Sequence, residues 1–319
     1  MSLFKIFLNK MKNINQVLFA IISLMLLAQS CTTSEKKTNE SASSEKKIGI
    51  LLVNHGSRSE TWRNELVRLE KNVIDSVLAS GEVKGLKTAF MEYTEPSIAT
   101  RLKEFDKEGF TDVVVVPIFL TVSPHTFEDL PTIMGQKEDK ASIEALKLEK
   151  IERYVPKAYI HLTPNLDFTD VLKRNVLRRA KELSKDAPHE GLVLIGYGDE
   201  TYDKEWTELF NQVATHVKHE IGISEHSHGW CGHIAHYNPA ETTKAVNEVL
   251  KKKEKAVVIP VLVAHDEDFQ LKIIGGGIEK VVDSEKKVSY KPDAILPDPD
   301  IQKWVISISK EFVGKIKNS

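Results

Sequence analysis

The chain has 319 residues, 28% of them charged, and a formal net charge of −2, so it is long enough for two small domains or one large one. This near-neutral balance argues against a nucleic-acid partner, which would require a basic surface. Only two cysteines occur, Cys31 and Cys231. If Cys31 carries a lipid, no internal disulfide can form, and the fold must depend on its hydrophobic cores.

Residues 1–30 have the pattern of a secretory signal peptide. A lysine-containing start precedes the apolar run "VLFAIISLMLLA", which is short for a membrane span, and the chain then reaches Cys31. This order predicts a lipoprotein-type signal peptide with lipidation at Cys31, an uncleaved N-terminal anchor being the alternative. In either case we expect an exported, membrane-anchored protein facing the periplasm or cell exterior. Residues 31–47, rich in Ser, Thr, Lys and Glu, are predicted to form a disordered tether.

Strands and helices are predicted to alternate from Ile48 onward. The apolar run "IGILLVN" is followed by a helix over 59–80, a strand "LKTAFMEY", a helix over 97–108 and the almost wholly apolar strand "DVVVVPIFL". The segment "AYIHL" and a helix over 166–183 complete this unit. Continuous apolar strands joined by helices are typical of parallel sheets covered on both faces. A doubly wound α/β domain is therefore expected over residues 48–184.

The same order of segments returns in the second half of the chain. "GLVLIGYGDE" resembles "ILLVNHGSRS", "HYNPAETT" resembles "EYTEPSIAT", and "AVVIPVLVAHDEDF" resembles "VVVVPIFLTVSPHTF". The offsets are 142, 143 and 143 residues, counted as Tyr197 from His55, Pro239 from Pro96, and Pro260 from Pro117. We expect two similar doubly wound parallel-sheet domains related by internal duplication, the second over 185–319, with a cleft between them. Chance similarity of generic α/β segments is the alternative.

Three polar side chains of the first half fall at the carboxyl ends of predicted strands, where parallel sheets bind ligands. His55 ends the first strand, Glu92 lies near the end of the second, and His125 lies eight residues beyond Pro117. Two imidazoles and a carboxylate suit a divalent first-row metal ion with open coordination positions. A single histidine at a strand end is more often structural, but three such groups on one edge favour a metal site.

The motifs "HGSR", "MEYTEPSI" and "VVVVPIFLTVSPHTFEDLP" together resemble class II chelatases of the sirohydrochlorin cobaltochelatase type, over about residues 48–305. The resemblance implies a lyase of cobalamin biosynthesis that inserts Co²⁺, or alternatively Fe²⁺ or Ni²⁺, into a tetrapyrrole held between two α/β domains. It also implies that His55 and His125 are the functional histidines and that Glu92 is the acidic residue of the metal site.

These residue types suit metal insertion. Histidine has a pKa near neutral pH, so His55 and His125 are expected to hold the metal while one of them also accepts pyrrole protons. Glu92 would balance the charge of the metal. Ser57 and Arg58 are expected to bind acidic substituents of the macrocycle, an ion pair between Arg58 and a helix acid being the alternative.

The second half departs from the motifs. Tyr197 and Asp268 stand where the two histidines would recur. We therefore expect a single metal site, with Tyr197 and the rest of the second domain forming a wall or lid over the substrate.

Six of the 11 histidines lie between residues 216 and 236, and three of the chain's histidines, His233, His236 and His265, are candidate ligands of an accessory metal. Solvated exposed histidines are the alternative. His233 and His236 are expected on an extended strand, which would point them to opposite faces. Cys231 is expected to be a small buried residue.

Two further segments complete the sequence-based predictions. "IIGGGI", starting at Ile273, weakly indicates an anion cradle at a helix start, but no nucleotide cofactor is expected. "LPDPDIQKW" predicts an N-capped final helix. The favoured function is a membrane-tethered chelatase. A non-catalytic extracytoplasmic protein that binds metal or tetrapyrrole is the alternative, and a solute-binding receptor fits the motifs less well.

Overall fold

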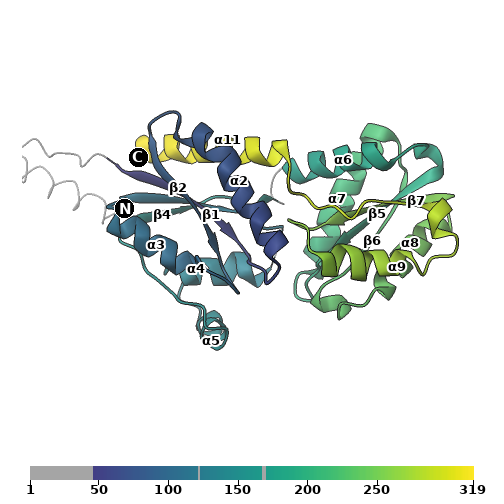
Figure 1. The fold of residues 1–319 in the computed structure, drawn as a ribbon, viewed down its shortest axis with the longest axis horizontal. Coiled ribbons are helices and arrows are strands. Elements are labelled where there is room, and N and C mark those ends of the chain that lie inside the picture. Colours follow the sequence, from purple (N-terminus) through teal and green to yellow (C-terminus); the bar gives the residue numbers. More distant parts are fainter. Residues whose placement is uncertain (1–45, 121–122, 167–169) are drawn as a thin grey trace, which may run out of the picture. The chain divides into compact units, whose positions relative to one another are not determined.

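Two four-stranded sheets, in which every pairing is parallel, form the framework of the described residues, which are 46–120, 123–166 and 170–319 of a computed structural model (Figure 1). The first sheet has the order β2-β1-β3-β4, with strands β1 (Ile48–Asn54), β2 (Val83–Phe90), β3 (Asp112–Pro117) and β4 (Tyr159–Leu162). The second has the order β6-β5-β7-β8, with strands β5 (Glu190–Gly196), β6 (Glu225–Trp230), β7 (Lys255–Val261) and β8 (Val288–Tyr290). The predicted α/β class with two similar parallel-sheet units is confirmed. The predicted signal peptide, Cys31 and nearly all of the predicted tether lie outside the described residues.

The central strands are apolar because helices cover both of their faces. Every residue of β1, β3 and β5 is buried. Helix α2 (Glu60–Leu78) begins after Ser59, whose hydroxyl accepts a hydrogen bond from the Trp62 amide, and it buries the apolar face that the sequence predicts, namely Leu66, Leu69, Val73 and Val77. Helix α3 (Ile98–Lys107) is capped in the same way by Ser97.

Equivalent residues of the two halves occupy equivalent places. Pro117 pairs with Val53 in the first sheet, and Pro260 pairs with Ile195 in the second. Two π-helices follow these central strands, η1 (His125–Asp129) and η5 (Asp268–Gly275), and their first residues are separated by the same offset of 143 that the sequence shows. The structure therefore agrees with the sequence repeat at the level of individual residues.

Two helices are exchanged between the halves. Helix α6 (Val171–Leu183) packs against α7 (Asp203–Ile221) and β7 of the second half, whereas the C-terminal helix α11 (Pro299–Lys317) packs against α2, β3 and α6 (Figure 1). The prediction that the helix over 166–183 completes the first unit is therefore wrong in its packing. Both helices are amphipathic, so their sequences do not specify which sheet they cover.

Polar interactions stabilise the position of α6 on the second half. The Arg179 guanidinium, 6% exposed, forms an ion pair with Asp293 and donates to the Pro260 carbonyl at 2.8 Å. Asn175 donates to the Ile295 carbonyl at 3.2 Å. Asp298 caps α11 as predicted, by accepting hydrogen bonds from the amides of the next residues. The chain passes between the halves at α6 and again in the segment between β8 and α11. These bonds hold those two segments together.

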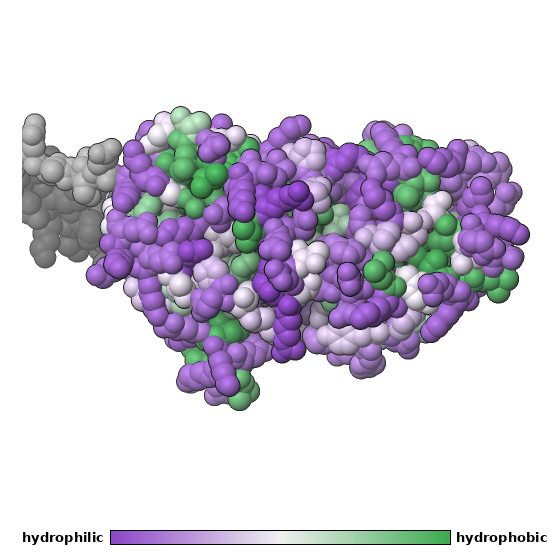
Figure 2. Space-filling view, viewed as in Figure 1, coloured by the Kyte–Doolittle hydropathy of each residue, from purple (hydrophilic) through white to green (hydrophobic). Residues whose placement is uncertain are grey.

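The remaining helical segments are short. They are α4 (Leu130–Ile133), α5 (Lys140–Leu148), η3 (Ala187–His189), η4 (His233–Ala235), α8 (Ala240–Leu250), α9 (Gly276–Ile278) and α10 (Ser284–Lys287). Hydrophilic residues predominate on the face shown in Figure 2, as expected when the apolar residues fill the sheets. None of the helices in the described part of the chain combines the length and apolar character that a membrane crossing requires.

Candidate metal site

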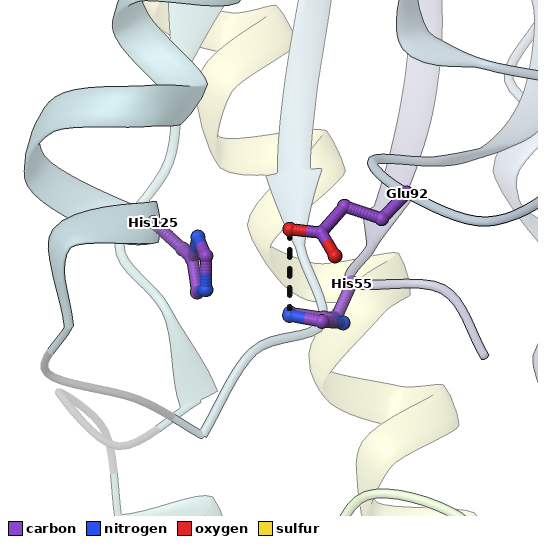
Figure 3. Close-up of side chains that lie close together, drawn as sticks. All are labelled: His55, Glu92 and His125. Carbon is purple, nitrogen blue, oxygen red and sulfur yellow. Dashed lines mark ion pairs between the residues drawn. The ribbon is translucent and has the colours of Figure 1, made fainter. Parts of the chain in front are cut away.

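The side chains of His55, Glu92 and His125 converge at the carboxyl-terminal edge of the first sheet (Figure 3). His55 follows β1 directly, Glu92 lies two residues after β2, and His125 is the first residue of η1. One nitrogen or oxygen atom from each residue lies within 4.8 Å of the others. Residues that are 37 and 70 positions from His55 are therefore brought together by the order of the strands, as the sequence predicts.

Backbone pairing beyond the strand ends positions His55 and Glu92. The amide of Met91 donates to the Asn54 carbonyl, and the amide of Glu92 donates to the His55 carbonyl, each at 2.8 Å. This close approach requires a glycine next. Gly56 has φ +102°, and a Cβ atom there would lie 2.2 Å from the Glu92 carbonyl oxygen. The glycine that follows His55 is thus explained by geometry.

A carboxylate orients the His125 imidazole. Nδ1 of His125 lies 2.8 Å from Oδ2 of Asp129, four residues later and one helical turn away. Because Nδ1–H donates to Asp129, the lone pair of Nε2 is left for a metal ion, an arrangement common among metal-binding histidines. Asp129 is a site residue that the sequence analysis missed, although its spacing from His125 was a usable signal.

A hydrogen bond to the carbonyl of the next residue orients the His55 imidazole. Its Nδ1 lies 3.1 Å from the Gly56 carbonyl, to which it donates, so Nε2 carries the free lone pair. That atom lies 3.9 Å from Oε1 of Glu92. The rings of His55 and His125 meet edge to face, with centroids 4.9 Å apart. Two imidazole nitrogens and one carboxylate are therefore presented to a common point.

Burial and charge distinguish the two imidazoles. Glu92 is only 8% exposed, whereas His55 and His125 are 38% and 33% exposed, so a ligand can reach the imidazoles over a buried carboxylate. Burial lowers the pKa of His55 despite the opposing charge of Glu92. Burial alone would also lower the pKa of His125, but the hydrogen bond to Asp129 and the charges of Glu92 and Asp129 raise it overall. The imidazole of His55 thus tends to be neutral, and His125 retains a proton to higher pH.

The second half has no equivalent metal site. By the offsets of the repeat, Tyr197, Ala235 and Asp268 replace His55, Glu92 and His125. Among the residues whose positions are described, the first-half group is the one cluster of three metal-ligating side chains.

An aromatic cluster, formed by Tyr197, His233, Tyr237 and Phe269, occupies the equivalent place instead. The Tyr237 hydroxyl lies 2.9 Å from Nδ1 of His233 and 3.3 Å from the Tyr197 hydroxyl. The ring of Tyr197 contacts those of His233 and Phe269, with centroids 5.5 and 5.7 Å away. Tyr197, predicted to bind substrate, therefore belongs to a hydrogen-bonded aromatic group.

Ser57 and Arg58 lie in the turn that follows His55 and Gly56. The Ser57 hydroxyl donates to Asp266 of the second half at 3.4 Å and accepts from the Ser59 amide, so it helps to hold the two halves together. The guanidinium carbon of Arg58 lies 5.1 Å from the centroid of the Tyr93 ring. Within the described part of the chain Arg58 forms no ion pair, so the alternative of a pair with a helix acid is not seen.

The histidine-rich segment differs from its prediction. Strand β6 ends at Trp230, and His233 begins η4, so His233 and His236 do not lie on a strand. His236 has φ +48°, the left-handed conformation that Tyr93 adopts at the equivalent position of the first half. His265 lies in the loop between β7 and η5, and the cluster of three ligating side chains includes none of these histidines.

Two other expectations have clear outcomes. Cys231 is a buried free cysteine, as expected. The "IIGGGI" segment does not begin a helix: it lies inside the continuous run formed by η5 and α9, so its amides are not free to bind an anion and the predicted cradle is wrong.

Comparisons with known proteins find similarity over part of the chain. Residues 49–183 match the family model described as CbiX. A protein of Methanococcoides burtonii named sirohydrochlorin cobaltochelatase is 36% identical over 92 residues, which are 28% of this chain and 64% of that protein. A protein of the same name from Methanocaldococcus jannaschii is 36% identical over 90 residues, 28% of this chain and 60% of that protein. The chain thus spans less than two thirds of the length of these relatives.

Solved structures share the fold across both halves. The sirohydrochlorin chelatase SirB from Bacillus subtilis subspecies spizizenii, solved in complex with cobalt, has a TM-score of 0.60 and 19% identity over 86% of this chain and 98% of that one. A multi-domain protein from Deinococcus radiodurans, described as structurally similar to chelatases, has a TM-score of 0.60 and 14% identity over 82% of this chain and 54% of that one. The two-unit architecture is therefore that of known chelatase structures.

Proposed function

We propose that this chain, whose residues 49–183 match the CbiX family model, inserts a divalent metal ion into a tetrapyrrole such as sirohydrochlorin. The observation that carries the proposal is the convergence of His55, Glu92 and His125 within 4.8 Å at the edge of the sheet. The names of the matched relatives, sirohydrochlorin cobaltochelatase, support the same substrate pair. Co²⁺ is the first metal to test, followed by Fe²⁺ and Ni²⁺, because two imidazoles and a carboxylate accept all three.

The three side chains would hold the metal substrate loosely enough to release it. Nε2 of His55, Nε2 of His125 and the Glu92 carboxylate supply three ligands and leave the other coordination positions for water and then for pyrrole nitrogens. Glu92 compensates the charge of the ion in its buried position. As each pyrrole N–H loses its proton, the remaining electron pair on nitrogen replaces one protein ligand or water on the metal.

Exposed apolar side chains around the site suit a flat macrocycle. The described residues include eight large exposed apolar side chains, of which four lie on segments that carry the metal site or its second-half counterpart, Tyr93, Phe127, Tyr237 and Leu271. The sirohydrochlorin ring is planar and apolar with carboxylate substituents. We propose that Arg58 binds one of those carboxylates through its paired N–H groups, which is supported by its position over the exposed Tyr93 ring.

We also propose that the protein is an exported lipoprotein attached to the membrane through Cys31. The order of the lysine-containing start, apolar run and cysteine in residues 1–31 supports this location. Cys31→Ala should release the protein from the membrane fraction and abolish labelling by a radioactive fatty acid. Unchanged labelling would contradict the proposal.

The enzymatic proposal is tested by following the visible spectrum of sirohydrochlorin mixed with the purified full chain and each metal separately. We expect insertion faster than in the protein-free reaction, with the acceleration lost in both His55→Ala and His125→Ala. His219→Ala is the matched control, because its imidazole is 85% exposed on α7. Circular dichroism establishes that each variant is folded. Tight binding of metal or tetrapyrrole without faster insertion would instead favour a non-catalytic binding protein.

A further inference from the structure

The aromatic cluster lies opposite the metal site. The edge of the first sheet meets that of the second through the hydrogen bond from Ser57 to Asp266 and through the rings of Phe127 and Tyr202, whose centroids are 6.0 Å apart. His233 is close enough to interact electrostatically with His55, and Tyr197 interacts with Tyr93 in the same way. The aromatic cluster of the second half therefore lies near His55 and Tyr93, on the side of the metal site that belongs to the other sheet.

Metal insertion leaves a chemical task that the metal ligands perform poorly. The neutral ring carries two pyrrole N–H groups, and both protons must leave as the dianionic ring binds M²⁺. Once His55 and His125 use their Nε2 lone pairs on the metal, and donate through Nδ1 to Gly56 and Asp129, neither has a lone pair left for a proton. A proton leaving toward the ion is also repelled by its charge. A base on the opposite face of the ring avoids both difficulties.

We propose that His233 is the base that accepts the pyrrole protons, on the macrocycle face opposite the metal, and that Tyr237 and Tyr197 are positioning residues for it. The inference rests on the proposed function and on the family resemblance, which implies a tetrapyrrole held between the two α/β halves. His233 is exposed, at the start of η4, and can therefore pass each proton on to water.

The proton balance of the step is simple. A pyrrole N–H bond breaks, the proton goes to a ring nitrogen of neutral His233, and the electron pair of that bond stays on the pyrrole nitrogen and binds M²⁺. The imidazolium then releases its proton to solvent and accepts the second one in the same way. In total the ring and M²⁺ give the metal complex and two protons.

The hydroxyl groups of the cluster hold the imidazole of His233 in place by hydrogen bonds. The Tyr237 oxygen lies 2.9 Å from Nδ1 and 3.3 Å from Nε2, so it can accept the N–H of the imidazolium while its own O–H donates to Tyr197 at 3.3 Å. Burial raises the pKa of the Tyr197 phenol, so this residue remains a neutral hydrogen-bonding group and does not itself act as the base.

The test measures sirohydrochlorin metallation by the full chain with Co²⁺, comparing His233→Ala and Tyr237→Phe with the His219→Ala control. We expect His233→Ala to lower kcat about 100-fold or more, the usual effect of losing a general base. Its KM and Co²⁺ affinity should be unchanged, the acidic limb of its pH–rate profile should disappear, and added imidazole should restore part of the rate. Tyr237→Phe should lower kcat about 10-fold while keeping the acidic limb, since it removes only one neutral hydrogen bond to a charged group.

The outcomes separate this inference from the function on which it depends. If the unmodified protein does not accelerate insertion, the proposed function itself fails. If it does, and His233→Ala retains kcat, the assignment of His233 is overturned. Loss of Co²⁺ affinity in His233→Ala would also overturn it, because it would make His233 a metal ligand. Should His233→Ala fail to fold, an unchanged kcat in Tyr237→Phe with wild-type circular dichroism would still count against the hydrogen-bonded base.

Discussion

Nδ1 of His125 lies 2.8 Å from the carboxylate of Asp129, and this hydrogen bond decides which nitrogen of His125 is available to a metal ion. Asp129→Asn keeps the shape of the partner but removes its charge. We expect Co²⁺ affinity to fall about 10- to 100-fold, as is usual when the carboxylate partner of a metal-binding histidine is lost. Isothermal titration calorimetry measures the change.

Glu128→Gln is the matched control for this variant. Glu128 is the adjacent acid in η1, but it pairs with Lys137 and not with a site histidine. An equal loss of Co²⁺ affinity in Glu128→Gln would mean that overall negative charge matters, and that the specific bond between Asp129 and His125 does not.

Metal affinity should depend on pH through His125. Metal binding needs the neutral imidazole, and the raised pKa of His125 means that protons compete with the metal at pH values above the ordinary histidine range of about 6.5. Affinity should therefore be complete above the pKa of His125 and decline as the pH falls through it. In Asp129→Asn the pKa of His125 should drop, because burial remains while the hydrogen bond to a carboxylate is lost, so the decline should move to lower pH. A midpoint that does not move between the two proteins, in Co²⁺ titrations over a pH series, would contradict this account.

Gly56 is predicted to be indispensable for the geometry of the site. In Gly56→Ala the added Cβ would meet the Glu92 carbonyl at 2.2 Å, so the turns after β1 and β2 must separate. We expect loss of Co²⁺ binding and a decrease in unfolding free energy of at least about 1–3 kcal/mol, measured by urea denaturation.

Gly109→Ala provides the control. Gly109 also has a positive φ, +75°, but its Cβ would meet no atom within 4 Å, so only the smaller backbone strain of about 1 kcal/mol should appear, with Co²⁺ binding intact.

The exchanged helices should make the two halves unfold together. Arg179, almost fully buried on α6, pairs with Asp293 in the segment between β8 and α11 and donates to the Pro260 carbonyl. Its replacement by alanine leaves the Pro260 carbonyl without this donor and Asp293 with only the more distant Lys291, at 3.8 Å. We expect Arg179→Ala to reduce the unfolding free energy by about 3–5 kcal/mol. Arg174→Ala, an exposed change on the same helix, should stay within about 0.5 kcal/mol of the unmodified protein. If Arg179→Ala has no larger effect than Arg174→Ala, the ion pair does not stabilise the exchange.

The sequence predicted those features that follow from strand order. Apolar strands and the repeat indicated parallel sheets, and parallel strands place their carboxyl ends on one edge, so His55, Glu92 and His125 could be grouped from the sequence alone. The helix exchange could not be predicted in this way, since α6 and α11 have similar apolar faces and either could cover either sheet.

A local turn explains why the end of the histidine-rich segment does not form the predicted strand. The predicted strand would have continued past Trp230, but the chain turns at Cys231 and Gly232, where the Gly232 amide donates to the Tyr197 carbonyl at 2.9 Å. A Cβ at Gly232 would lie 2.6 Å from that same carbonyl oxygen, so the turn depends on a glycine. Contacts of this kind join residues 35 positions apart and cannot be read from the alternation of side chains.

The most direct measurement of the central claim is an X-ray structure of the full chain with Co²⁺, using anomalous scattering at the cobalt edge. The account predicts one anomalous peak bonded to Nε2 of His55, Nε2 of His125 and a Glu92 oxygen. Cobalt bound elsewhere, with these three side chains unliganded, would contradict it.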